Sequence, residues 1–267
     1  MRYLIITIIL FSLSLNSCIS PSPIDLDDVF EEKIIIEATI FEDEYARVLI
    51  SKSVSKTDEN IFPRVENAQI ILSNNGNEET LKNRSNGLYE SEEIVGIVGE
   101  IYELEVKIDN QIYRAISTLP EQSIFLDSIV FKQEINFQDS NYISPLNIFL
   151  YTSDNITSKD YGFFDLTIGN AQSQSTFHLF EDDNSDPCTN FWTENTVFQG
   201  TELRVDLFQV DEDVFKYFEG LKQINSRVDF IGLPVAPPAN LEGNFTNGAL
   251  GYFGAMNTDS IVRVLGQ

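Results

Sequence analysis

The sequence predicts an all-β protein that carries one helix, and three observations support this. Short runs rich in β-branched and apolar residues recur from residue 33 onward. Clusters of Asn, Asp and Gly separate those runs, as turns separate strands. One segment, residues 211–224, instead has apolar side chains three and four positions apart, which is the helical period. We therefore expect strands in nearly every segment and a single helix late in the chain.

The first part, residues 33–120, is expected to form an immunoglobulin- or transthyretin-like β-sandwich. Its clearest strand is 101–108, where Tyr102, Leu104, Val106 and Ile108 alternate with charged residues. Asp109 and Asn110 then form a turn into a second strand at 111–118, which predicts a hairpin. Earlier strands are expected at 33–40, 47–51 and 69–73, the last of them ending in the turn cluster 74–77.

The second part, residues 121–267, is expected to be a β-rich domain that includes the helix. In the helix, Asp211 is a suitable N-cap, and Glu212 and Asp213 favour the positive helix start. The aromatic stripe of this helix is expected to pack on a sheet. A glycine-rich segment, residues 240–254, predicts tight turns or bulges. The strands of this part are expected at 123–131, 146–152, 161–169, 175–180, 202–210, 249–255 and 260–265.

The N-terminus has the parts of a secretory signal peptide, residues 1–17. Arg2 is followed by an apolar run that ends at Leu15 and is too short to span a bilayer. Residues 15–18 resemble a lipobox, which predicts that Cys18 becomes the lipid-modified N-terminus of the mature protein. Residues 18–32 would then form a lipidated acidic tether, stiffened by Pro21 and Pro23. Ordinary secretion without a lipid is the alternative.

The charge of the chain limits its partners. The sequence has 42 acidic and 17 basic residues, and a formal net charge of −25. Nucleic acids and anionic membrane surfaces would repel such a chain, so we expect membrane contact through the lipid anchor only. If Cys18 is acylated, Cys188 is the sole remaining thiol, and the mature monomer has no intramolecular disulfide.

The candidate sites for chemistry are few. His178 is the only histidine, so a Ser-His-Asp or Cys-His device would have to use it; we expect no catalytic residues and no enzyme activity. Asp182, Asn184 and Asp186 have the spacing that opens a calcium loop, although Pro187 breaks the pattern and a solvated acidic loop is the alternative. Trp192, beside this loop, is a candidate ligand-binding residue that could stack on a sugar.

Several segments of the chain, taken in order, form a recognisable pattern. They are 65–70, 87–89, 99–104, 118–120, 126–129, the helix at Tyr217 and Phe218, 240–244 and 251–253. Together these segments resemble a family of outer-membrane lipoproteins of unknown function in Bacteroidota. The resemblance implies a lipoprotein that is commonly associated with TonB-dependent transporters, and it brings no catalytic residues. Acidic residues soon after the cysteine also resemble an export signal, which favours the extracellular face of the outer membrane over the periplasmic one.

The leading functional prediction is a non-enzymatic accessory subunit of an outer-membrane β-barrel complex. The partner would be a barrel protein, such as a TonB-dependent transporter or the β-barrel assembly machinery, together with other lipoproteins. Edge strands and the loops 181–200 and 232–248 are the expected contact surfaces. A surface protein that captures a glycan or peptide is the second prediction, and a carboxylate- or calcium-dependent hydrolase is the third. No cofactor is expected beyond the lipid on Cys18, calcium being the one alternative.

Overall fold

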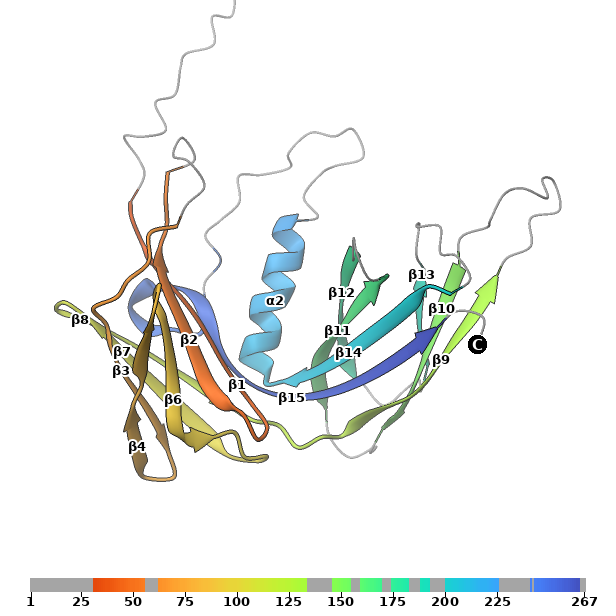
Figure 1. Cartoon of the computed structure of the whole chain (residues 1–267), viewed down its shortest axis with the longest axis horizontal. Helices are drawn as coiled ribbons and strands as arrows, with labels where there is room; N and C mark the ends of the chain where they lie inside the picture. Colours follow the sequence, from red (N-terminus) through yellow and green to blue (C-terminus); the bar gives the residue numbers. More distant parts are fainter. Residues whose placement is uncertain are drawn as a thin grey trace, which may run out of the picture.

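The computed structural model contains a long, curved sheet that runs through the whole protein (Figure 1). It describes residues 31–55, 62–133, 146–154, 159–169, 174–182, 188–192, 200–225, 241 and 243–264. The sheet has eight strands. In spatial order they are β12 (Gln174–Asp182), β11 (Asp160–Ile168), β14 (Glu202–Val210), β15 (Leu250–Val264), β1 (Ile34–Phe41), β2 (Tyr45–Lys52), β6 (Leu88–Val95) and β5 (Lys82–Ser85).

Two smaller sheets cover one face of the long sheet. Over its N-terminal half lie β4 (Asn77–Thr80), β3 (Gln69–Asn74), β7 (Ile101–Ile108) and β8 (Gln111–Thr118), in that order. Over its C-terminal half lie β13 (Cys188–Trp192), β10 (Leu146–Asp154) and β9 (Ile124–Gln133). Separate apolar cores fill the two spaces: the first includes Ile36, Val48, Leu104 and Phe253, and the second includes Leu150, Phe164, Val205 and Leu207. The expected all-β, sandwich-like fold is confirmed.

The helix α2 (Glu212–Asn225) packs on the other face of the long sheet (Figure 1). Its buried Val214 and Phe215 contact a third core that includes Met256. Gly254 lies beneath the helix, since a Cβ there would lie 3.4 Å from the Val214 methyl groups, and it would lie closer still to the Met256 methyl group, at 2.5 Å. The N-cap is confirmed, since Asp211 Oδ1 accepts a hydrogen bond of 2.9 Å from the Val214 amide. No helix of the described residues is long and apolar enough to cross a membrane.

The last strand, β15, connects the two halves of the long sheet. Its first part pairs in parallel with β1, from Leu250 opposite Ile35 to Met256 opposite Phe41. Its second part pairs antiparallel with β14. Two strands at 249–255 and 260–265 were expected here, and that prediction was wrong. The polar residues 257–259 fall between the two expected strands, but they lie within β15, next to the point where it exchanges one neighbour for the other. The division into domains near residue 120 stays a prediction, and the sheet continues across it.

Polar side chains join the halves at the centre of the molecule. Asp211 Oδ2 accepts hydrogen bonds from the Ser117 hydroxyl (2.5 Å) and from the Thr118 amide (3.0 Å) at the end of β8. The Ser117 oxygen in turn accepts a hydrogen bond from the Ala255 amide of β15, at 2.8 Å. The buried Gln209 of β14 accepts from two backbone amides at the start of β9 and from Ser123 Oγ. One carboxylate and one amide therefore fix both small sheets to the long one.

Candidate binding surface on the concave face

The long sheet curves around α2, so the face that carries the helix is concave (Figure 1). The strand register identifies the residues whose side chains lie on this face. Gly254, which touches α2, lies opposite Thr39 of β1, and Thr39 lies opposite Arg47 of β2. Arg47 lies opposite Glu90 of β6. Because side chains of directly paired residues point to one side of a sheet, these residues share the concave face with the helix.

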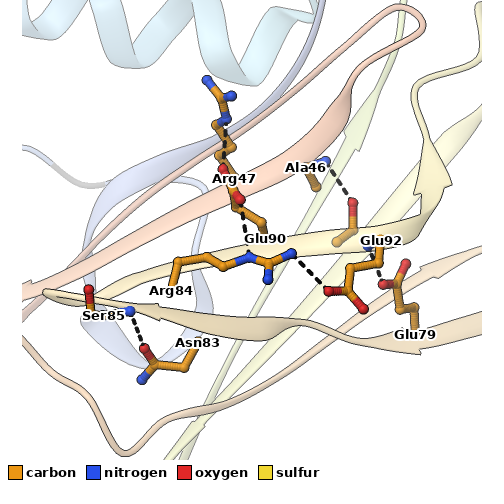
Figure 2. Close-up of polar contacts among 9 residues, drawn as sticks. Ala46, Arg47, Glu79, Asn83, Arg84, Ser85, Glu90 and Glu92 are labelled. Carbon is orange, nitrogen blue, oxygen red and sulfur yellow. Dashed lines mark hydrogen bonds and ion pairs between the residues drawn. The ribbon is translucent and has the colours of Figure 1, made fainter.

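A first depression, which we call the arginine pocket, lies on this face at the N-terminal end of the long sheet. Its volume is about 510 Å³. Figure 2 shows that two arginines converge there on one carboxylate. Arg47 Nε lies 3.1 Å from Glu90 Oε1, and Arg84 Nε lies 3.3 Å from Glu90 Oε2. Arg84 Nη2 lies 2.8 Å from Glu92 Oε1. The lining residues are Asp43, Glu44, Tyr45, Arg47, Arg84, Glu90, Ser91 and Glu92.

The position of Arg84 follows from the turn between β5 and β6. The cross-strand register shifts between Asn83 and Ser85, which leaves Arg84 as the extra residue of a β-bulge. Asn83 Oδ1 holds the bulge by accepting a hydrogen bond of 2.6 Å from the Ser85 amide. Ser85 and Asn86 have φ values of 80° and 54°, and Gly87 has 72°. The bulge therefore sets the direction in which the guanidinium leaves the strand.

The floor of the arginine pocket is held by two side chains that lie beneath it. Ser91 Oγ accepts a hydrogen bond of 2.8 Å from the Ala46 amide and donates one of 2.8 Å to the Ile94 carbonyl. The carboxylate of Glu79, on β4, accepts from three successive backbone amides, of residues 92, 93 and 94, at 2.5, 3.0 and 2.8 Å. Glu79 is 9% exposed. The backbone that carries Glu92 is therefore tied to both sheets.

A second depression, which we call the β14–β15 pocket, lies on the same face and shares Glu44 with the first. Its volume is about 440 Å³. Arg204 forms a fork onto Asp206, two residues along the same strand, with Nε–oxygen distances of 2.9 and 2.8 Å. This carboxylate raises the pKa of Arg204 above its ordinary value. The Phe208 ring stacks on Phe163 at 4.6 Å between centroids. The lining residues are Phe41, Glu44, Arg204, Asp206, Phe208, Thr258, Asp259 and Ser260.

An aromatic cluster lies where α2 packs on β15. Tyr252 lies 5.0 Å from both Tyr217 and Phe218, measured between ring centroids. Burial, and to a smaller extent the charge of Glu37, raises the pKa of Tyr252 to about 12. Burial also raises the pKa of Tyr217. Both phenols are therefore neutral at physiological pH and support the helix as apolar groups.

The site residues expected from the sequence lie elsewhere. Cys18, Asn184 and Asp186 are outside the described residues, so the lipid and calcium predictions stay predictions. Asp182 ends β12 in the long sheet, whereas Trp192 ends β13 in a smaller one. Within the described residues, no group of three or more His, Cys, Asp and Glu is placed to hold a metal ion.

His178 lies in β12 opposite Phe164, in a half-buried position. Burial, and then the charge of Lys222, lowers its pKa below the ordinary value, so this imidazole is neutral at pH 7.

Sequence reasoning missed both depressions. The two arginines of the arginine pocket come from strands that are distant along the chain, and only the register brings Arg47 beside Glu90. One local signal was present. Arg84 stands between Asn83 and the turn residues Asn86 and Gly87, and a charged residue next to such a turn is a candidate for an outward-pointing, bulged position.

Residues 19–261 match the sequence profile of DUF4249, a family described as a domain of unknown function. No curated protein matches the chain. Asn244 and Phe253, which belong to two of the segments that carry the resemblance, are hydrogen-bonded to each other in the structure. The Asn244 amide donates to the Phe253 carbonyl at 2.7 Å, and Asn244 Oδ1 accepts from the Phe253 amide at 2.9 Å. Because the match spans nearly the whole chain, the protein belongs to the DUF4249 family.

Proposed function

We propose that this protein is an outer-membrane lipoprotein, anchored through Cys18, that acts as a non-catalytic accessory subunit of a β-barrel complex. The barrel would be a TonB-dependent transporter or the β-barrel assembly machinery. The observation that carries the proposal is the concave face. It presents two open depressions with ordered arginines and carboxylates, while the opposite face of the long sheet is covered by two further sheets. Such a face suits contact with another protein.

The anchor and the tether support this placement. Residues 1–18 have the features of a lipoprotein signal, and the resemblance to Bacteroidota lipoproteins points to the outer membrane. The segment from Cys18 to Glu31, fully extended, could span at most about 45 Å. That reach would let the folded part lie against the rim of a neighbouring barrel. The acidic tether favours the extracellular face.

Affinity purification from detergent-solubilised membranes tests the proposal. A full-length chain with a C-terminal tag should bring down one β-barrel protein in stoichiometric amount. Cys18→Ser should abolish both the lipid and the recovery from membranes, and Cys188→Ser is the matched control that should change neither. Recovery of the wild-type lipoprotein alone in mild detergent would contradict the accessory role. Recovery of Cys18→Ser with the membrane fraction would contradict the anchor.

Capture of a glycan is the second candidate, and the β14–β15 pocket favours it. The ring of Phe208 lines this pocket together with one guanidinium, three carboxylates and the hydroxyls of Thr258 and Ser260. Polar groups that converge beside an aromatic ring are a common arrangement for binding sugars. Calorimetry of the purified full chain with a panel of oligosaccharides tests this candidate. Binding that Arg204→Ala reduces about tenfold or more supports it, and the absence of heat with every sugar rejects it.

A further inference from the structure

The arginine pocket combines an exposed aromatic ring with ordered charges. Tyr45 is 50% exposed, although a large ring is usually more deeply covered. The side chains of Arg47 and Arg84 are 65% and 41% exposed. Tyrosine and arginine are the residue types that are enriched where protein interfaces bind most strongly. The pocket therefore offers three exposed side chains of the types that contribute most to protein binding, Tyr45, Arg47 and Arg84.

The charges of the pocket are held in place before any partner arrives. Each carboxylate oxygen of Glu90 forms an ion pair with one arginine, and Arg84 forms ion pairs with both Glu90 and Glu92. The backbone beneath is fixed by Glu79 and Ser91. Side chains that are already ordered lose less conformational entropy when a partner binds. The network therefore lowers the entropic cost of using this surface.

The charge balance of the pocket selects the occupant. Four carboxylates and two guanidinium groups line it, and the guanidiniums are already paired with Glu90 and Glu92. Asp43 and Glu44 have no cationic partner among the described residues. An ammonium or guanidinium group is the complement of these two carboxylates, and the face of the Tyr45 ring can also attract a cation. The net charge of −25 would steer a basic segment toward the protein.

We propose that the arginine pocket is the docking site for a lysine- or arginine-bearing segment of a partner protein. The basic side chain lies against Asp43, Glu44 and the ring of Tyr45, and the Arg47–Glu90–Arg84 network forms the ordered wall beside it. This proposal rests on the proposed accessory function for the identity of the partner. The chemistry of the pocket itself does not depend on that function.

A direct titration tests the pocket without any knowledge of the partner. Two fluorescent peptides, one with three lysines and one with three glutamines in their place, are titrated with the full chain in detergent at 0.15 M salt. The double variant Asp43→Asn, Glu44→Gln should weaken binding of the lysine peptide about fivefold or more. Asn tolerates the backbone at position 43, where φ is 57°. The glutamine peptide should bind neither form.

A matched control separates the pocket from general attraction to an acidic protein. Glu78 and Glu103 are exposed carboxylates that flank Ser73 on the outer face of the four-stranded sheet β4-β3-β7-β8. Glu78→Gln with Glu103→Gln removes the same charge far from the pocket and should leave affinity within about twofold. Equal weakening by both double variants, or by neither, would overturn the proposal.

Photo-crosslinking in cells tests the partner. A photoreactive amino acid replaces Tyr45, and crosslinked peptides are sequenced by mass spectrometry. We expect a peptide of the co-purified barrel protein that contains lysine or arginine at the crosslink. A peptide without a basic residue, or a glycan, would overturn the proposal. If the barrel co-purifies and position 45 gives no crosslink, the docking site is wrong and the accessory function stands. If no barrel co-purifies, the accessory function fails and the titration still decides the pocket.

Discussion

The two depressions on the concave face hold their arginines in different ways. In the β14–β15 pocket, Arg204 and Asp206 are two residues apart on one strand, so their ion pair needs no other part of the fold. In the arginine pocket, the charges come from β2, β5 and β6, and Glu79 supports them from another sheet. The first is a local pair and the second is a network made by the tertiary fold. A substitution that disturbs the supporting sheet should therefore weaken the ion pairs of the arginine pocket and leave the Arg204–Asp206 pair unchanged.

The largest effect is expected from Asp211, which links the two halves that carry the depressions. Asp211→Ala removes the cap of α2 and leaves the buried Ser117 and the Thr118 amide without their acceptor. We expect a loss of about 3 kcal/mol in the free energy of unfolding, measured by urea denaturation. Asp213→Ala, an exposed acid of the same helix, should cost under about 0.5 kcal/mol. Equal losses in the two variants would contradict the bridging role.

Tyr252, in the aromatic cluster where α2 packs on β15, should make the free energy of unfolding depend on alkaline pH. Its pKa is raised to about 12 in the folded state, whereas an unfolded tyrosine ionises near 10. The stabilisation is therefore complete below about pH 10 and is lost as pH rises from about 10 to 12, by roughly 2 to 3 kcal/mol. Urea denaturation of the wild type and Tyr252→Phe across this range measures it. Parallel pH curves for the two proteins would show that the phenol does not contribute.

Beneath the arginine pocket, the Glu79 carboxylate accepts from three backbone amides of one strand, whereas Asp259 of the β14–β15 pocket accepts one amide from a smaller sheet, that of Leu126 on β9. Glu79→Gln keeps the shape but weakens the acceptor for three backbone amides, and we expect a loss of about 1 to 2 kcal/mol. Its neighbour Glu78 is exposed, so Glu78→Gln should fall within about 0.5 kcal/mol of the wild type. Thermal denaturation followed by circular dichroism measures both. A difference too small to detect between the two variants would mean that the floor of the pocket is not held by this carboxylate.

The smallest effects distinguish the network from the local pair. Double-mutant cycles for Arg47 with Glu90 and for Arg204 with Asp206 should each give a coupling energy under about 1 kcal/mol, because all four side chains are in contact with solvent. Adding Glu79→Gln should lower the coupling of the first pair and leave the second unchanged. A change in both couplings would show that the depressions are not independent.

Much of the fold could be predicted from the sequence, because its signals are local. The alternation in residues 101–108 predicts β7 and its buried face, and Asp211 predicts the start of α2. The parallel pairing of β1 with β15 could not be predicted, since no local pattern identifies a neighbour from the other end of the chain. The polar residues of β15 at the change of neighbour also hid its continuity.

The candidate site was less predictable than the fold. The predicted site rests on a pattern that is local along the chain: the spacing of Asp182, Asn184 and Asp186, with Trp192 beside them. The described depressions instead arise from register, as between Arg47 and Glu90, and from the bulge at Arg84. The acidic composition also makes the two depressions hard to recognise in the sequence. Acidic residues are abundant everywhere, and the few arginines that pair with them carry no local pattern that identifies their partners.

The pairing of the first described strand with the last one sets an order for folding. Ile36 of β1 and Phe253 of β15 belong to the same apolar core, so that core can close only after β15 has been made. A chain that is still being made and lacks this strand could not complete the core. Addition of β15 would then be the step that joins the two ends of the described chain in one packed unit.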